Sequence, residues 1–272
     1  MTGFTLLAVP SRRWLFLAAF AAATVLLIPL ESYLPGAACW LAAAVALARD
    51  PDPAARRRLG VLLGTIALLA AAPIHTDLSN GHFLRLGAFF LAVVVGPAAI
   101  LARTDPGVVD FRFWPRRLRW QDVVFTLLSV PLAYAVFRWW FFHADPGLAG
   151  HWRLPLQPDS EQTWRLIVGI NCVGIWDELF FLNTVYATLR SLFPRRLANA
   201  AQAVVYTSVL YDMAFTGTGP LIVGAFALTQ GAMYEGSRSL LWVLIVHLVV
   251  DFFLVGAILQ QYYGPGFSKL VF

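Results

Sequence analysis

Two pairs of ionisable residues lie inside long apolar stretches of the sequence. Asp177 and Glu178 are adjacent at the midpoint of an apolar segment of about 27 residues, 164–190. His247 and Asp251 lie four residues apart in a second apolar stretch, 240–259. A segment as long as the first can cross a hydrocarbon layer of about 30 Å, and a charged side chain at the bilayer centre costs at least ~2.5–3.5 kcal/mol. The four residues therefore indicate a functional site within the membrane.

These residue types support general acid–base chemistry. A carboxylate in a low-dielectric site can take a proton from water. A histidine four residues before a carboxylate shares its side of a helix, so the carboxylate can orient the ring for oxyanion stabilisation or proton relay. Water held between Asp177 or Glu178 and His247 would suit hydrolysis of an amide bond. The alternative is a polar network that only pins helices together, whose interhelical hydrogen bonds average ~0.6 kcal/mol.

The helices that carry these residues must place them at similar depths. At a rise of about 1.5 Å per residue, Asp177 lies about 20 Å from either end of its helix. His247 and Asp251 lie about 12 and 18 Å from the N-terminal end of theirs. Tyr206 and Asp212 lie about 14 and 22 Å from the start of the apolar run 197–214, which contains them. The depths overlap, which predicts that the groups converge on one water-accessible cavity.

Further polar residues in this part of the chain share helix faces. Asn199, Gln202 and Tyr206 follow one another at spacings of three and four, and Tyr234 follows Gln230 at a spacing of four, so each set lies on one face. We expect three polar groups to support the site, and they are Asn183, Tyr206 and Asp212.

The composition assigns the chain to the polytopic membrane proteins. Hydrophobic residues make up 59% and charged residues 13% of its 272 residues, with a mean hydropathy of +0.69, whereas a soluble domain carries about 25% charged residues. The net charge of +5 comes from arginine clusters between apolar runs. The positive-inside rule accounts for such clusters, and they give no evidence of nucleic-acid binding. Cys39 and Cys172 lie in apolar stretches and form no disulfide framework or metal spacing.

Apolar runs between Arg, Pro and Gly residues predict an all-α bundle of eight or nine transmembrane helices. The candidate spans are 14–33, 36–48, 59–74, 83–102, 122–142, 164–189, 197–214, 219–234 and 239–259. A cytoplasmic N-terminus places most of the arginines inside, provided that four spans precede the arginine cluster 103–119. The first apolar run is too long for a signal-peptide core, so we expect an uncleaved span. The polar segment 143–162 divides an N-terminal part, 1–145, with about five spans, from a four-span part, 164–260.

The remaining four histidines fall at the outer ends of spans or in outside loops, and they are His75, His82, His143 and His151. The stretch HTDLSNGH, 75–82, contains metal-binding residue types. Because the four histidines share no helical spacing, we expect them to be solvated loop residues.

Several segments together are similar to the CAAX-prenyl-endopeptidase and bacteriocin-self-immunity superfamily. They are WDELFFLN at 176–183, the polar run 197–214, YEGSRSLLWVLIVH at 234–247 and HLVVD at 247–251. The resemblance covers about residues 164–260. It implies an intramembrane glutamic endopeptidase that works without a metal, although oxygen and imidazole ligands such as those of the four ionisable residues could in principle hold one.

The family's motifs are a Glu-Glu pair followed four residues later by Arg, then Phe-x-x-x-His, then His-x-x-x-Asn or Asp. By the resemblance, Asp177 stands at the position of the first, water-activating Glu, and Glu178 keeps the second. The third motif is intact, because His247 and Asp251 match it directly.

Two positions depart from the family's pattern. The Arg position is Leu182, so Glu178 lacks that ionic partner. In the second motif the aromatic position is Tyr206 and the His position is Leu210; moving the register to Tyr211 and Phe215 does not restore the histidine.

We therefore expect an intramembrane endopeptidase that cleaves a peptide bond in a membrane-associated protein or peptide, without a cofactor. Asp177, assisted by Glu178, would activate water, and His247, oriented by Asp251, would stabilise the tetrahedral intermediate. A composition rich in Arg, Ala and Leu with a single Lys suits a high-GC bacterium, so we expect the protein in a bacterial inner or plasma membrane. Two alternatives remain open. One is a non-proteolytic membrane scaffold or sensor, which the missing Arg and His motivate, and the other is a transporter that uses the carboxylates as a proton relay.

Overall fold

The computed structural model describes residues 9–156, 158 and 160–264, and the regular elements within these residues are all helical. The α-helices are α1 (Ser11–Leu27), α2 (Tyr33–Ala48), α3 (Pro53–Leu69), α4 (Asn80–Thr104), α5 (Trp120–Trp139), α6 (Ser160–Asp177), α7 (Ala187–Arg190), α8 (Arg195–Tyr211), α9 (Gly219–Ser237) and α10 (Leu240–Tyr263). A π-helical turn, Trp140–Ala144, extends α5, and a 3-10 turn spans Leu148–His151. A π-helical segment, Glu178–Tyr186, joins α6 to α7. The predicted all-α fold is confirmed.

Each predicted apolar run overlaps mainly one helix or one continuous helical rod of the described chain, although the runs 14–33 and 59–74 extend past the helix ends at Leu27 and Leu69. Four of these are long and apolar enough to cross a membrane, and they are Asn80–Thr104, Trp120–Ala144, Glu161–Arg190 and Leu240–Tyr263. The run predicted at 36–48 forms a helix of 16 residues because α2 begins earlier, at Tyr33. The helices α1, α3 and α8 have 17 residues each, which is close to the shortest length that spans a bilayer, roughly 17 residues.

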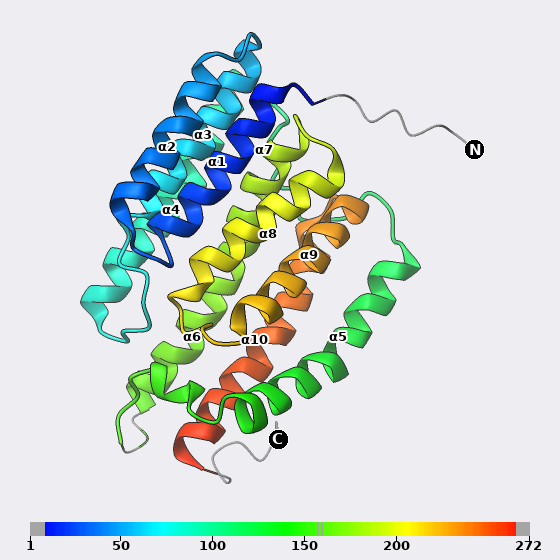
Figure 1. The fold of residues 1–272 in the computed structure, drawn as a ribbon. Helices are drawn as coiled ribbons and strands as arrows, with labels where there is room; N and C mark the ends of the chain where they lie inside the picture. Colours follow the sequence, from blue (N-terminus) through cyan, green and yellow to red (C-terminus); the bar gives the residue numbers. More distant parts are fainter. Residues whose placement is uncertain (1–8, 157, 159, 265–272) are drawn as a thin grey trace.

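The helices form a bundle in which α6, α8, α9 and α10 lie between two flanking groups. The four N-terminal helices gather along one side of the bundle, and α5 lies on the other side against α10 (Figure 1). One apolar cluster runs from Phe20 of α1 and Leu62 of α3 through Phe90 of α4 to Phe181 and Tyr206. A second cluster joins α5 to α10. The division into 1–145 and 164–260 stays a prediction, and the first cluster contains residues from both parts.

The segment that precedes α5 caps the beginning of α10. The backbone N–H groups of Leu240 and Leu241 donate to the carbonyls of Arg112 and Phe113 at 2.9 and 3.0 Å. The first N–H groups of a helix have no partner within it. The 105–119 connection therefore fixes where α10 starts, and with it the depth of His247.

Ion pairs connect the helix ends and loops that contain the arginine clusters. Arg13 contacts Asp50 at 2.8 Å, which ties the start of α1 to the connection between α2 and α3. Arg57 and Arg58 of α3 contact the buried Asp105 after α4 at 3.1 and 3.0 Å. Arg58 also donates to the Ser191 hydroxyl at 3.3 Å, which joins the N-terminal helices to the end of α7.

The expectation that the outer histidines are solvated is wrong for one of them. His75, His143 and His151 are exposed, but His82 is only 1% exposed. It lies in the first turn of α4, where its ring stacks on that of His75 with a centroid distance of 3.9 Å. Periodicity could not predict this contact, since His75 lies in the loop between α3 and α4 and the path of that loop brings it against α4.

The Asp105 cluster predicts an acid-sensitive contribution to stability. Burial alone would raise the pKa of Asp105, but hydrogen bonds from Arg57 and Arg58 lower it below its ordinary value of 3.8. Because the folded pKa is the lower one, the stabilisation is complete above pH 3.8 and is lost as the pH falls through the folded pKa. We expect Asp105→Asn to lower the unfolding free energy at neutral pH by about 1.5–3 kcal/mol.

Thermal unfolding of the detergent-solubilised protein from pH 7 to pH 3 measures this difference. The wild type should lose stability at the acid end and converge towards Asp105→Asn. Parallel curves for the two proteins over the whole range would contradict the assignment.

Candidate active site

The two adjacent carboxylates lie where the longest helical rod changes its winding. Asp177 is the last residue of α6 and Glu178 is the first of the π-helical segment. The wider winding is visible at the end of the segment, where the backbone N–H of Ala187 donates to the carbonyl of Leu182, five residues earlier. Single π turns inside α-helices occur frequently at functional sites.

Trp176 anchors this part of the rod to α4. Its indole stacks on Phe90 with ring centroids 3.7 Å apart and an interplanar angle of 8°. The indole N–H also donates to the Phe90 carbonyl at 2.7 Å. Since Trp176 directly precedes Asp177, these two contacts fix the height and rotation of the carboxylate pair.

His247 of α10 contacts all three buried carboxylates of the predicted site. Its Nδ1 lies 2.6 Å from Oε1 of Glu178, and its Nε2 lies 3.6 Å from Oδ2 of Asp177 and 3.6 Å from Oδ1 of Asp251. All four residues are at most 4% exposed. The sequence prediction that the acids of 164–190 meet the imidazole of 240–259 is therefore met by the geometry, whereas their catalytic roles remain predictions.

Tyr206 bridges the same group from α8. Its hydroxyl donates to Oδ2 of Asp177 at 3.3 Å and lies 3.4 Å from Nδ1 of His247. Leu210, at the position where the family's second motif has histidine, lines the same cavity. A phenol hydroxyl is thus the polar group that α8 presents to Asp177 and His247.

Gln230 of α9 completes the surroundings of Glu178. Its side-chain amide donates to Oε1 of Glu178 at 3.2 Å and to the Val243 carbonyl at 3.1 Å. Sequence reasoning noticed Gln230 as one of two polar residues on a helix face but did not include it among the site residues. The signal in the sequence was an amide within an apolar run, four residues before Tyr234; the structure adds that Gln230 is fully buried.

Two predicted supporting groups lie outside this cluster. Asn183 is fully buried, but its side-chain oxygen accepts a hydrogen bond from the Tyr234 hydroxyl at 3.0 Å. Asp212 follows the end of α8, where partial burial and the neighbouring Glu31 raise its pKa to about 6. Neither residue lines the cavity described below.

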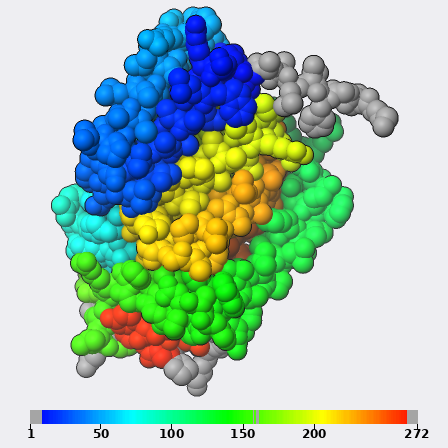
Figure 2. Space-filling model, viewed as in Figure 1, coloured from blue at the N-terminus to red at the C-terminus, as the bar shows by residue number. Residues whose placement is uncertain are grey.

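A cavity of about 420 Å³ opens beside the cluster. Its polar lining includes Asp177, His247, Asp251 and Tyr206, but Glu178 does not line it. Apolar side chains from α4, α5, α6, α8, α9 and α10 form most of the remaining wall. Figure 2 shows a hollow in the molecular surface between α9 and α5, in which part of α10 is visible.

Several oxygens of the cluster have no protein partner. Asp177 Oδ1, Glu178 Oε2 and Asp251 Oδ2 are buried and make no hydrogen bond with the protein. Buried polar atoms need a partner from protein, water or ligand. Asp177 and Asp251 also line the cavity, so their unpaired oxygens can serve water or a bound substrate, whereas Glu178 remains behind the His247 ring.

The arrangement supports acid–base chemistry on a molecule in the cavity. Asp177 can accept a proton from water, and the His247 ring, fixed by carboxylates at both nitrogens, can stabilise developing negative charge. We also searched the described residues for groups of three or more His, Cys, Asp or Glu whose ligand atoms all lie within 4.8 Å of one another. One such group is found, and it consists of His75, Asp77 and His82. The absence of a metal at Asp177, Glu178, His247 and Asp251 stays a prediction.

The segment that contains this cluster matches the model of a known protein family. Residues 159–253 match the model of a family described as type II CAAX prenyl endopeptidase Rce1-like. The match confirms the resemblance to the CAAX-prenyl-endopeptidase superfamily over these residues, and with the apolar helices it identifies an integral membrane protein. Searches of curated proteins and of solved structures gave no match.

The short contact between His247 and Glu178 predicts strong energetic coupling. In a double-mutant cycle of Glu178→Gln and His247→Asn, we expect an interaction energy of at least ~1.7 kcal/mol, the upper end found for hydrogen bonds within membranes. Chemical unfolding of the four proteins in detergent provides the measurement. The control cycle pairs Glu178→Gln with Tyr234→Phe, because Tyr234 bonds to Asn183 instead; it should give less than about 0.5 kcal/mol. Equal values in the two cycles would refute the special role of the contact.

Proposed function

We propose that the protein is an intramembrane endopeptidase that hydrolyses a peptide bond in a membrane-associated protein substrate. The observation that carries the proposal is that Asp177 and His247 face one cavity, within the segment that matches a CAAX prenyl endopeptidase family. The mostly apolar wall of that cavity suits an apolar substrate segment. We further infer a bacterial inner or plasma membrane with a cytoplasmic N-terminus.

In this proposal Asp177 is the general base. It takes a proton from water while the water oxygen attacks the scissile carbonyl carbon. Negative charge then develops on the carbonyl oxygen, and His247 stabilises it together with the Tyr206 hydroxyl. When the C–N bond breaks, the leaving amine receives the proton that Asp177 accepted. A carboxylic acid and an amine are the products, so all atoms and protons are accounted for.

Glu178 and Asp251 act on the imidazole in this proposal. Glu178 lies 2.6 Å from Nδ1 of His247, and Asp251 lies 3.6 Å from Nε2. Carboxylates at both ring nitrogens hold the ring in one orientation. The two adjacent acids thus have different roles. Asp177 accepts the proton of the attacking water, and Glu178 orients His247.

Substitution of the base tests the proposal. We expect Asp177→Asn and His247→Ala to lower cleavage of a membrane protein substrate by at least about 100-fold, as loss of a general base or an oxyanion donor commonly does. Reconstituted protein and mass spectrometry of the products provide the measurement. His143→Ala, at an exposed site after α5, is the matched control and should keep wild-type activity. Full cleavage by both Asp177→Asn and His247→Ala would overturn the mechanism.

Close packing of α6 on α10 gives a second test. A methyl group at Gly174 would overlap Asp251 Oδ2 and lie 2.9 Å from His247 Cδ2, whereas one at Gly87, on the cavity wall of α4, meets no atom within 4 Å. We expect Gly174→Ala to displace both side chains and to lower the cleavage rate by at least about 10-fold, since small misplacements at an active site cost up to about 100-fold. Gly87→Ala should keep its activity. Equal activities of the two folded variants would contradict this geometry.

A non-proteolytic scaffold or sensor is the second candidate. Leu182 and Leu210 occupy the positions where the family has Arg and His, and both are buried apolar side chains. A partner segment would then bind in the cavity without being cleaved. In that case Asp177→Asn would keep the biological activity, while bulky substitutions on the cavity wall would abolish it.

A further inference from the structure

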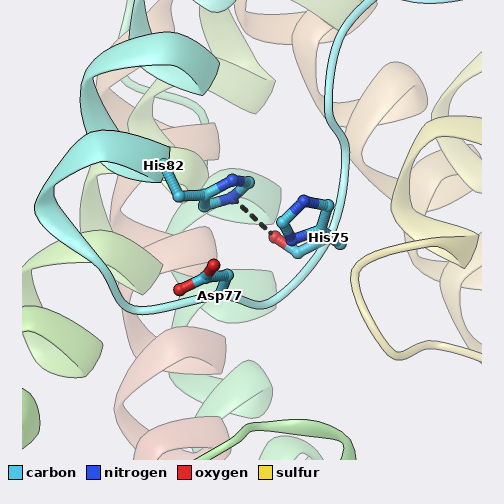
Figure 3. A group of neighbouring side chains, drawn as sticks. All are labelled: His75, Asp77 and His82. Carbon is cyan, nitrogen blue, oxygen red and sulfur yellow. Dashed lines mark hydrogen bonds between the residues drawn. The ribbon is translucent and has the colours of Figure 1, made fainter.

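A second group of titratable side chains lies on the wall of the same cavity. His75 and Asp77 belong to the loop between α3 and α4, and His82 belongs to the first turn of α4. One ligand atom from each residue can be chosen so that all three lie within 4.8 Å of one another. Figure 3 shows the two imidazole rings facing each other, with the Asp77 carboxylate beside His82.

His82 has the hydrogen-bonding pattern of a metal ligand. Its Nε2 lies 3.0 Å from the carbonyl oxygen of His75, and because a carbonyl only accepts, this nitrogen carries the hydrogen. Its Nδ1 therefore keeps a free lone pair. This atom is buried and has no hydrogen-bond partner in the protein, and the whole residue is only 1% exposed. Metal-binding histidines characteristically donate their other ring N–H to a carbonyl or carboxylate.

The other two residues can complete the ligand set if their side chains turn. Asp77 accepts the Ser79 backbone N–H on Oδ1 at 2.7 Å, which orients the carboxylate. His75 is exposed and can turn its ring. Ligand atoms around a tetrahedral zinc lie about 3.4 Å apart, as metal–ligand distances of about 2.1 Å require. One ligand atom from each residue already lies within 4.8 Å of the others. Because a metal lies in the plane of a ligating imidazole and the two rings are stacked with centroids 3.9 Å apart, zinc binding requires the exposed His75 ring to leave the stack and turn a nitrogen towards the metal.

We propose that His75, Asp77 and His82 form a binding site for Zn²⁺ with an open fourth position. Two imidazoles and one carboxylate are a ligand set that zinc takes when water or another ligand fills the fourth position. All three residues line the cavity that also contains Asp177 and His247. Bound zinc would tie the loop after α3 to the start of α4 and so fix this part of the cavity wall. The expectation that these histidines are free loop residues is replaced by this proposal, which does not depend on the proposed peptide hydrolysis.

Zinc titration of the full-length protein tests the site. The protein in detergent is stripped with a chelator, and binding of Zn²⁺ is measured by competition with a chromophoric zinc indicator. We expect about one equivalent to bind. His75→Ala and Asp77→Asn should each weaken binding by more than the about 10–100-fold that changes around a metal ligand typically cost. Zinc should also raise the melting temperature of the wild type but not that of His75→Ala.

Two controls separate this site from other metal-binding groups. His143→Ala removes an exposed histidine outside the group and should bind zinc as the wild type does. Glu178→Gln changes the buried carboxylate cluster and should also leave zinc binding unchanged. Because His82 is buried, His75→Ala and Asp77→Asn, which alter loop residues, decide the outcome. Absence of zinc binding by the wild type would overturn the proposal, as would zinc binding that Glu178→Gln abolishes and His75→Ala preserves.

Discussion

The contact of 2.6 Å between His247 Nδ1 and Glu178 Oε1 is the constraint on which the arrangement of the C-terminal helices depends. An unpaired carboxylate at this depth would cost several kcal/mol, roughly the range measured for charges at the bilayer centre. Glu178 avoids that cost through the imidazole from α10 and the amide of Gln230 from α9. Three helices are thereby held at fixed heights relative to one another. Tyr206 adds the fourth, α8, through Asp177.

The adjacent carboxylates differ because of where their shared helix directs them. Successive residues of an α-helix point about 100° apart, so a helix that turns Glu178 towards α9 and the His247 ring turns Asp177 towards the cavity. The indole of Trp176 fixes that rotation by its hydrogen bond to Phe90. The absence of a side chain at Gly174 lets Asp251 and His247 approach α6 closely. The proposed division of labour between base and positioning residue follows from these contacts.

Both polar groups on the cavity wall are exceptions in an otherwise apolar lining. One is the carboxylate–imidazole cluster, and the other is the histidine–aspartate group at the start of α4. Of the two departures from the family's motifs, Leu210 lines the cavity and Leu182 does not. Leu182 and Leu210 introduce apolar surface where charged or polar side chains stand in the family, and the hydroxyl of Tyr206 is the polar group that α8 contributes. A molecule bound in the cavity would contact Leu210 and Tyr206.

The sequence alone determined that the chain is an all-helical membrane protein, because nine apolar runs require helices wherever backbone polar groups cannot reach water. It also determined that Asp177, Glu178, His247 and Asp251 belong together, since charges within lipid need partners. Only the tertiary structure decided which partners they take. Gln230 joins Glu178 while Asn183 and Asp212 turn elsewhere, because helical spacing gives a residue's face but not the rotation and register of the helix that carries it. The His75–His82 pair escaped prediction for a related reason, since a loop whose path no periodicity specifies brings the two rings together.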